Sequence, residues 1–143
     1  VRNQGAWDIT NAKIIIGGKN PKNLPETYFE STLLTNVSPD MKVWKEEVFG
    51  PVLPIITFNT EEEALNLAND TEYGLGGYVL TEDKERANRV AARIKTGMIS
   101  INGTLYLHPS SPFGGYKKSG IGREHGKYGL HELCQIKVVA MEK

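Results

Sequence analysis

Two clusters of residues in this sequence could take part in chemistry. The first is the glycine-rich tract PFGGYKKSGIGREHGKYG at residues 112–129, where glycines alternate with lysines, an Arg-Glu pair and aromatic side chains. Glycine accepts positive φ and lets other atoms approach its backbone closely, so such a tract is typical of a loop around a ligand or a packed interface. The second is KEEVFGPV at residues 45–52, where two carboxylates precede an aromatic residue and a Gly-Pro turn.

The acidic cluster has two interpretations. Adjacent carboxylates such as Glu46 and Glu47 usually belong to a solvated surface. Here they come before a predicted strand, and in open α/β sheets ligands bind at loops beside strand ends. A carboxylate can accept hydrogen bonds from two ribose hydroxyls, and Phe49 would suit a flat ring. From the residues alone, a solvated surface and a ligand site both stay open.

The glycine tract resembles two phosphate-binding motifs and matches neither. Residues 120–122 followed by Gly126 differ by one position from the dinucleotide fingerprint, and no apolar strand directly precedes them. Lys118 and Ser119 resemble the end of a P-loop, but Lys117 stands where that motif requires glycine. Both phosphate interpretations are rejected.

A helix with a glycine face explains the second half of the tract better. Gly122, Gly126 and Gly129 are four and three residues apart, which places them on one face of a helix over residues 122–133. Each glycine costs a helix about 1 kcal/mol relative to alanine. Close packing against another backbone would offset this cost, so we expect that face to be buried.

Other nucleophiles and metal ligands are not evident. Cys134 lies at the start of an apolar segment without an activating base nearby, so we expect a buried, inert thiol. His125 and His131 are six residues apart and share no helix face, and His108 has no Cys or carboxylate at ligand spacing. From the residues alone we therefore expect an unreactive thiol and no metal site in this chain.

Composition excludes several classes of protein. The chain has 143 residues, a length typical of one domain, and a formal net charge of +0 that favours neither nucleic acid nor an anionic membrane. No apolar run is long enough to span a bilayer, and the first residues do not resemble a signal peptide. The single cysteine suits a reducing cytoplasm. Because the sequence begins with Val1 rather than Met, we expect a piece of a longer protein.

Alternating apolar patterns predict an α/β fold with a mainly parallel sheet. Strands are expected at residues 13–16, 28–37, 51–58, 76–80, 98–102 and 135–141. Thr60 and Glu63 form a capping box that begins a helix over residues 60–69. A second helix is expected to begin at Thr81 and stop before Gly97. Two consecutive strand–helix–strand units predict parallel pairing with right-handed crossovers.

Taken together, the motifs resemble the C-terminal part of the aldehyde dehydrogenase superfamily. The resemblance covers residues 12–143, whereas residues 1–10 do not resemble the family. It rests on motifs that follow one another in the family's order: KEEVFGPV at 45–52, AND-x-x-YGL at 68–75, GMISIN at 97–102, SPFGGYKKSGIGREHGKYGL at 111–130, and KVV at 137–139.

The resemblance implies a domain plan. Residues 1–11 would be a lead-in of unclear origin, and residues 12–121 the later part of the catalytic domain. Residues 122–133 would form a helix that packs toward a cofactor domain. Residues 134–143 would form a strand that extends out to a partner subunit, giving a dimer or tetramer.

The resemblance also implies an activity. The family oxidises an aldehyde to a carboxylic acid with NAD or NADP through a cysteine thiolate, a thioester and a water activated by glutamate. The family's Cys, Glu and oxyanion Asn lie upstream of this segment, as does its Rossmann domain. Cys134 follows the PFGG motif and does not match that nucleophile. The chain is therefore expected to be a fragment that is inactive alone.

Four site residues follow from the motif match. Glu47 would bind the nicotinamide ribose, and Phe49 would pack near the nicotinamide. Phe113 would line the substrate tunnel, and Leu107 would occupy a second tunnel position where the family often carries an aromatic residue. The alternatives are a non-catalytic oligomerisation or regulatory module of the same fold, and a related acyl-phosphate or acyl-CoA reductase.

Overall fold

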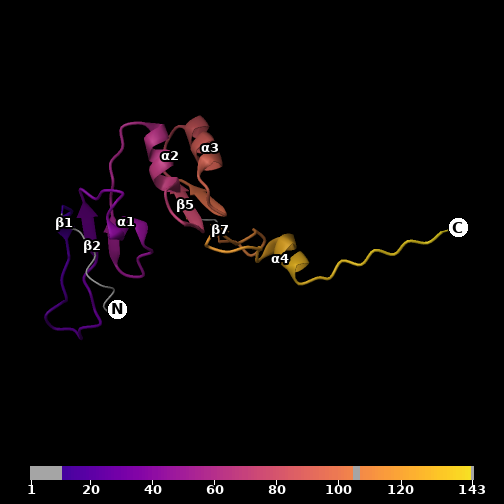
Figure 1. Cartoon of the computed structure of the whole chain (residues 1–143), viewed down its shortest axis with the longest axis horizontal. Helices are drawn as coiled ribbons and strands as arrows, with labels where there is room; N and C mark the ends of the chain where they lie inside the picture. The colour runs from indigo at the N-terminus through magenta and orange to yellow at the C-terminus, as the bar shows by residue number, and fades with distance from the viewer. Residues whose placement is uncertain (1–10, 105–106, 143) are drawn as a thin grey trace. The chain divides into compact units, whose positions relative to one another are not determined.

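The computed structural model describes residues 11–104 and 107–142. Its internal contacts divide the chain into two units, one ending at Asn59 and the other beginning at Thr60 (Figure 1). The length alone predicted one domain, so this division is a difference from the sequence-based expectation. The boundaries implied by the resemblance refer to a larger protein and stay predictions.

The first unit is a small mixed sheet with one helix. Its elements are β1 Lys13–Ile16, β2 Thr32–Thr35, α1 Lys42–Lys45 and β3 Val52–Pro54. The strand order is β1-β2-β3. β1 and β2 are antiparallel with an irregularity between Ile14 and Ile16, and β2 and β3 are parallel.

The core of the first unit gathers where β2 leads into α1. Leu34, Val37, Met41 and Val43 are buried there. β2 alternates buried and half-buried residues, so its inward side presents Thr32 and Leu34. The buried Thr32 hydroxyl accepts a hydrogen bond from the Gly18 amide and donates one to the Glu30 carbonyl, each at 2.8 Å. A buried hydroxyl with both roles satisfied adds no desolvation penalty to the core.

The second unit contains four short strands and three helices among its described residues. They are α2 Glu61–Asn69, β4 Tyr73–Gly74, β5 Gly76–Val79, α3 Lys84–Arg93, β6 Met98–Ile101, β7 Tyr116–Lys117 and α4 Gly126–Glu132. β5 pairs with β6 in parallel, and β4 pairs with β7 antiparallel. The buried apolar side chains of this unit are Leu65, Val79, Ala87 and Met98.

The α/β class is confirmed, and so is one strand–helix–strand unit. β5 and β6, which are joined by α3, pair in parallel, with Gly76 opposite Met98 and Val79 opposite Ile101. Asn102 continues this pairing beyond β6: its side chain accepts from the Thr81 amide at 2.9 Å and donates to the Thr81 carbonyl at 2.7 Å. The N-cap half of the predicted capping box is confirmed as well, since the Thr60 hydroxyl accepts from the Glu63 amide at 3.1 Å.

The expectation of a mainly parallel sheet needs correction. The described strands form three separate sheets, and the β1/β2 and β4/β7 pairs are antiparallel. Parallel strands need a crossover connection of a dozen or more residues, usually a helix, whereas antiparallel strands can be joined by a loop alone. β1 and β2 are joined by a loop, and the sequence patterns did not reveal β4, β7 or α1.

Two predicted helix starts are wrong. Helix α3 begins after Asp83, whose side chain accepts from the Arg86 amide at 2.9 Å, and not at Thr81. The helix expected over residues 122–133 begins at Gly126, because Gly122 and His125 adopt positive φ of 82° and 60°. Positive φ lies outside the right-handed helical region, and Gly126, where α4 begins, still has a φ of 56°.

The buried glycine face is only partly right. No residue of α4 is buried among the described residues. Other backbone atoms nevertheless approach these glycines closely, since a Cβ on Gly126 would lie 2.5 Å from the Ser110 carbonyl oxygen. A Cβ on Gly129 would lie 2.6 Å from the Glu124 carbonyl carbon.

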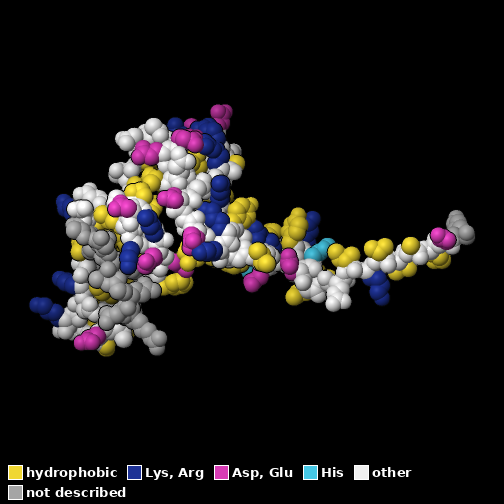
Figure 2. Space-filling view, viewed as in Figure 1, with side chains coloured by type: hydrophobic (Ala, Val, Ile, Leu, Met, Phe, Trp, Pro, Cys, Tyr) yellow, Lys and Arg dark blue, Asp and Glu magenta, His cyan; other side chains and the backbone are white. Residues whose placement is uncertain are grey.

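The C-terminal segment differs from expectation in two respects. Residues 134–142 form no strand, and their apolar side chains are 80% to 91% exposed at Ile136, Val138, Val139 and Met141. Figure 2 shows these hydrophobic side chains along the extended end of the chain. Cys134 is exposed rather than buried, with its thiol donating to the Leu130 carbonyl at 3.2 Å. A strand needs a neighbour for its backbone hydrogen bonds, and the described residues supply none here.

Candidate functional site

Glu47 and Phe49 lie on the segment that joins α1 to β3. Burial alternates along it: Val48 is half-buried against the core of the first unit, while both neighbours are exposed. The Phe49 side chain is 78% exposed. A side chain anchored inward between two outward ones presents those two to the surroundings. The motif therefore uses Val48 as an anchor and displays a carboxylate and a phenyl ring.

Both ends of this segment are held by the fold. At the α1 end, the Glu46 amide donates to the Lys42 carbonyl at 2.8 Å. At the β3 end, the Thr32 amide donates to the Pro51 carbonyl at 2.8 Å, and Val52 packs against the same core as Val48. The two displayed side chains thus stand on backbone that the core positions.

The chemistry available to this pair fits a sugar and a flat ring. Among the described residues, none forms a hydrogen bond or ion pair with the Glu47 carboxylate. Its oxygens are free to accept from two neighbouring hydroxyls. The exposed face of Phe49 can cover an aromatic ring, which would remove apolar area from water. This exposure is compatible with a ligand site and with a solvated surface, the two interpretations left open above.

Phe113 stands at the start of a loop that folds back on itself. Its amide donates to the Glu124 carbonyl at 2.8 Å, and the Glu124 amide donates to the Phe113 carbonyl at 2.7 Å. This reciprocal pair is an isolated antiparallel bridge. The half-buried Phe113 ring lies 5.9 Å from the His125 ring, centroid to centroid, at 45°. The glycine tract is therefore a closed loop, with a helix only at its end.

Leu107 is 63% exposed and lies in the second unit, as Phe113 does. Glu47 and Phe49 belong to the first unit. The four predicted site residues thus form two pairs, one in each unit.

Three of the sequence motifs meet in the second unit. The Lys118 amide donates to the Glu72 carbonyl at 2.9 Å, and the Gly74 amide donates to the Ser119 hydroxyl at 2.9 Å. The Gly97 amide donates to the Gly74 carbonyl at 3.0 Å. A Cβ on Gly97 would collide with the Gly114 carbonyl oxygen. Helix α3 ends at Arg93 with Ile94 as its C-cap, so Gly97 does not stop this helix. Glycine at 97 instead lets the PFGG turn approach.

Lys117 attaches the same loop to the end of α2. Its ammonium donates to the carbonyls of Asn69 and Thr71, both at 2.9 Å, which satisfies acceptors at a helix C-terminus. Its backbone has a φ of 53°, a left-handed conformation. Sequence reasoning used Lys117 only to reject a P-loop and missed this role.

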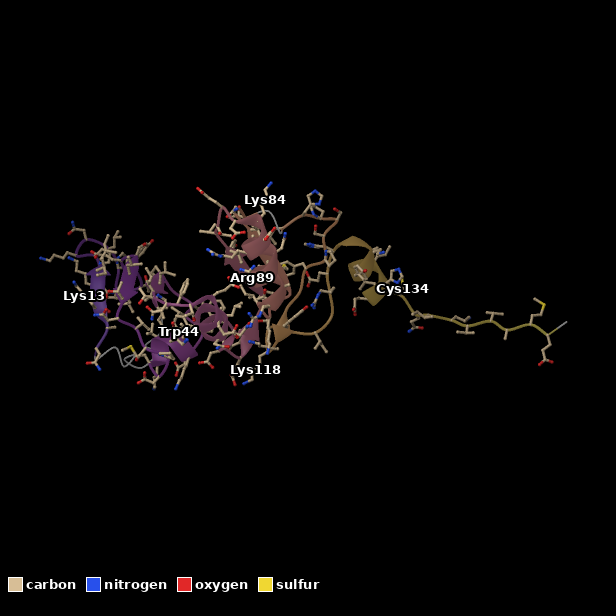
Figure 3. All side chains as sticks on the ribbon, turned by 90° about the horizontal axis from the view of Figure 1, so that it is seen from above. Lys13, Trp44, Lys84, Arg89, Lys118 and Cys134 are labelled. Carbon is tan, nitrogen blue, oxygen red and sulfur yellow. The ribbon has the colours of Figure 1, made fainter. Side chains whose placement is uncertain are left out.

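Surface ion pairs support the arrangement. Lys118, labelled in Figure 3, pairs with Glu72 at 2.7 Å, and this hydrogen bond raises the pKa of the Lys118 ammonium. Arg89 of α3 donates two hydrogen bonds of 2.8 Å to the Glu61 carboxylate of α2. The hydrogen bond from Arg89 lowers the pKa of Glu61. Exposed pairs of this kind contribute little individually, so they join helices more than they stabilise the fold.

Other chemistry is not assembled in the described part of the chain. Residues 11–104 and 107–142 contain no group of three or more His, Cys, Asp or Glu side chains placed to hold a metal ion. Within the same residues, every helix is too short or too polar to cross a bilayer. The exposed Cys134 thiol donates to a helix carbonyl, and no base is hydrogen-bonded to it.

Sequence comparison finds aldehyde dehydrogenases. The sequence model described as the aldehyde dehydrogenase family matches residues 8–139, beginning slightly before the resemblance noted above. The chain is 47% identical over 129 residues to aminoaldehyde dehydrogenase 1, peroxisomal, of Pisum sativum, covering 90% of this chain and 26% of that protein. It is 48% identical over 132 residues to betaine aldehyde dehydrogenase of Bacillus subtilis, covering 90% and 27%. The chain thus spans about a quarter of the length of these curated relatives.

Structural comparison finds the same class of protein. Betaine aldehyde dehydrogenase from Staphylococcus aureus, solved in complex with NAD+, matches with a TM-score of 0.80 and 46% identity over 86% of this chain and 25% of that one. Succinate-semialdehyde dehydrogenase from Burkholderia pseudomallei matches with a TM-score of 0.81 and 46% identity, with the same coverage of 86% and 25%.

Proposed function

This chain belongs to the aldehyde dehydrogenase family, and from that premise we propose that it is the C-terminal portion of an enzyme that oxidises an aldehyde to a carboxylic acid with NAD or NADP. The observation that carries the proposal is the family match over residues 8–139. This range includes the two long motifs, KEEVFGPV at 45–52 and SPFGGYKKSGIGREHGKYGL at 111–130, in their family order. The chain supplies part of the walls of the site and no catalytic residue.

Glu47 and Phe49 are the proposed contacts to the cofactor. When bound, the nicotinamide accepts a hydride from the substrate. The Glu47 carboxylate would accept hydrogen bonds from the ribose hydroxyls and so orient the sugar. Phe49 would cover the ring and exclude water from it. Their exposure on anchored backbone and the free carboxylate oxygens support this assignment.

Phe113 and Leu107 are the proposed walls of the substrate tunnel. Phe113 is held by backbone bonds on both sides of its Cα and presents a rigid ring. Leu107 is smaller and aliphatic, so it would leave more room than an aromatic residue. The relatives are named for aminoaldehydes, betaine aldehyde and succinate semialdehyde, so we propose a small aldehyde without choosing among these.

An activity assay tests the proposal. The complete gene product should reduce NAD+ or NADP+ when given an aldehyde, without coenzyme A or phosphate, and the 143-residue chain alone should not. A strict requirement for coenzyme A or phosphate would favour the acyl-transferring reductases. A gene product with no cysteine-bearing segment before Val1, and with no activity, would favour a non-catalytic module.

Residues 134–143 are the proposed oligomerisation strand. The apolar side chains of this segment are exposed, and an unpaired segment of this kind is a template for pairing with another chain. Val138→Asp together with Val139→Asp should shift the complete enzyme toward monomers in light-scattering measurements. An unchanged mass would contradict the assignment.

For location we propose the cytoplasm, supported by the single cysteine. The names of several relatives specify peroxisomes or chloroplasts. Fractionation of cells that express the complete gene product would distinguish these compartments.

A further inference from the structure

Arg123 holds the two sides of the glycine loop together. Its Nη1 atom donates to the Gly115 carbonyl at 3.0 Å and to the Gly122 carbonyl at 2.6 Å. Its guanidinium carbon lies 5.5 Å from the centre of the Tyr116 ring, a cation–π contact. One side chain thus joins the segment that follows Phe113 to the segment that returns toward Glu124.

The Arg123 guanidinium has partners of a different kind from those of the other arginines in the second unit. Arg86, Arg89 and Arg93 each form ion pairs with carboxylates. In the described part of the chain no carboxylate forms an ion pair with Arg123, whose partners are carbonyl oxygens and an aromatic face. A planar fork with several fixed donors suits that set, whereas the ammonium of lysine provides a point charge.

Gly114 leaves no space for a side chain beside Arg123. A Cβ on Gly114 would lie 2.8 Å from the Arg123 Cδ and 2.7 Å from the Gly122 carbonyl oxygen. The Gly115 backbone packs instead on Ser119, since a Cβ on Gly115 would lie 2.5 Å from the Ser119 Cβ. The backbone that directly follows Phe113, at Gly114, is therefore packed on this arginine.

We propose that Arg123 is a positioning residue for aldehyde selectivity. It holds the Gly114-Gly115 turn against the return segment, so the bridge between Phe113 and Glu124 stays closed and the Phe113 ring keeps one position. This inference rests on the proposed function, in which Phe113 lines the substrate tunnel. Arg123 acts through Phe113 and makes no contact with substrate.

Amide hydrogen exchange on the complete enzyme tests the first half of the proposal. In Arg123→Gln and Arg123→Lys, the amides of Phe113 and Glu124 should exchange about tenfold faster, the loss expected for one charge-assisted hydrogen bond. Arg89→Gln is the matched control, since it removes an arginine bound to a carboxylate, and it should leave those two amides unchanged. Unchanged exchange in both Arg123 variants would overturn the proposal.

Relative rates test the second half. The ratio of kcat/KM for a short linear aldehyde to that for a bulky branched one is measured in one preparation, so the fraction of folded enzyme cancels. Arg123→Gln should change this ratio roughly tenfold, the size typical of a steric change in an apolar pocket, and in the same direction as Phe113→Ala. Arg123→Lys should fall between wild type and Arg123→Gln, and Arg89→Gln should not change it.

The possible results distinguish failure of the positioning role of Arg123 from failure of the tunnel assignment of Phe113. If Phe113→Ala changes the ratio and Arg123→Gln does not, Arg123 is not a positioning residue. If neither changes the ratio but exchange at Phe113 increases, the loop closure stands and the tunnel assignment fails. If the Arg123 variants do not fold, Tyr116→Leu removes the stacking surface while keeping the arginine. It should then accelerate exchange at Phe113 and Glu124, and unchanged exchange would refute the inference.

Discussion

Asn69 joins the C-terminal ends of α2 and α3, and its removal should destabilise the second unit measurably. Its Nδ2 donates to the Arg93 carbonyl at 3.0 Å, and its Oδ1 accepts from the Lys95 amide at 2.7 Å. Asn69→Ala removes both bonds and leaves a carbonyl and an amide without this partner. At about 0.5–1.5 kcal/mol for each of two hydrogen bonds, the free energy of unfolding should fall by about 1–3 kcal/mol.

Asn66 provides a control of the same residue type on the same helix. It is exposed, and its side chain forms no hydrogen bond within the described residues. Alanine has the higher helix propensity, so Asn66→Ala should leave the free energy of unfolding unchanged or raise it by about 0.5 kcal/mol. Both variants make the same change in a helix, so their difference isolates the two hydrogen bonds of Asn69.

Asn69→Asp separates the two bonds. Aspartate keeps an acceptor for the Lys95 amide but places a second oxygen against the Arg93 carbonyl. The Lys95 amide should therefore stay protected from hydrogen exchange in Asn69→Asp and lose protection in Asn69→Ala. Denaturant unfolding gives the free energies, and exchange at Lys95 gives the local effect. Equal stability of Asn69→Ala and Asn66→Ala, with Lys95 still protected, would refute the reasoning.

Three further predictions concern other parts of the chain. In the complete enzyme, Glu47→Gln should raise KM for the nicotinamide cofactor about tenfold, since it weakens one charged hydrogen-bond acceptor, with an unchanged circular dichroism spectrum; unchanged kinetics would contradict the assignment. Because Arg89 lowers the pKa of Glu61 in the folded state, this pair stabilises the fold above the unfolded pKa of about 4.3, and its contribution is lost as pH falls through the lower folded value. Unfolding curves of wild type and Glu61→Gln should therefore differ near neutral pH and converge in acid, and a constant difference would argue against the pair. Gly97→Ala should cost about 1–3 kcal/mol of stability, because its methyl group meets the Gly114 carbonyl, and thermal unfolding would measure it.

Local signals in the sequence predicted local structure well. The capping box at Thr60 predicted the start of α2, and the apolar spacing in α3 predicted the parallel β5/β6 unit around it. Such signals work because a helix N-terminus and an amphipathic face depend on residues within one or two turns. The prediction at Thr81 was wrong since two residues compete there: Asp83 caps α3, and the Thr81 backbone is already bound by Asn102.

The structure of the glycine tract could be predicted only in part from its residue types. Its composition predicted close approach, which Gly126 and Gly129 confirm. The predicted helix over residues 122–133 was too long, since positive φ at Gly122 and His125 turns the chain before α4. Residue types alone do not predict these two turns, because glycine permits positive φ without requiring it and positive φ is uncommon for histidine.

The sequence by itself determined the family, the α/β class and the residues of the two long motifs, because the spacing of those motifs is specific. Only the tertiary structure decided which hydrogen bonds join one motif to another. Lys117 caps α2 from 48 residues away, Ser119 accepts from Gly74 across 45 residues, and Arg123 holds the turn that follows Phe113. Such hydrogen bonds depend on the path of the chain through space, and residue types in sequence carry no record of which carbonyl a side chain will reach.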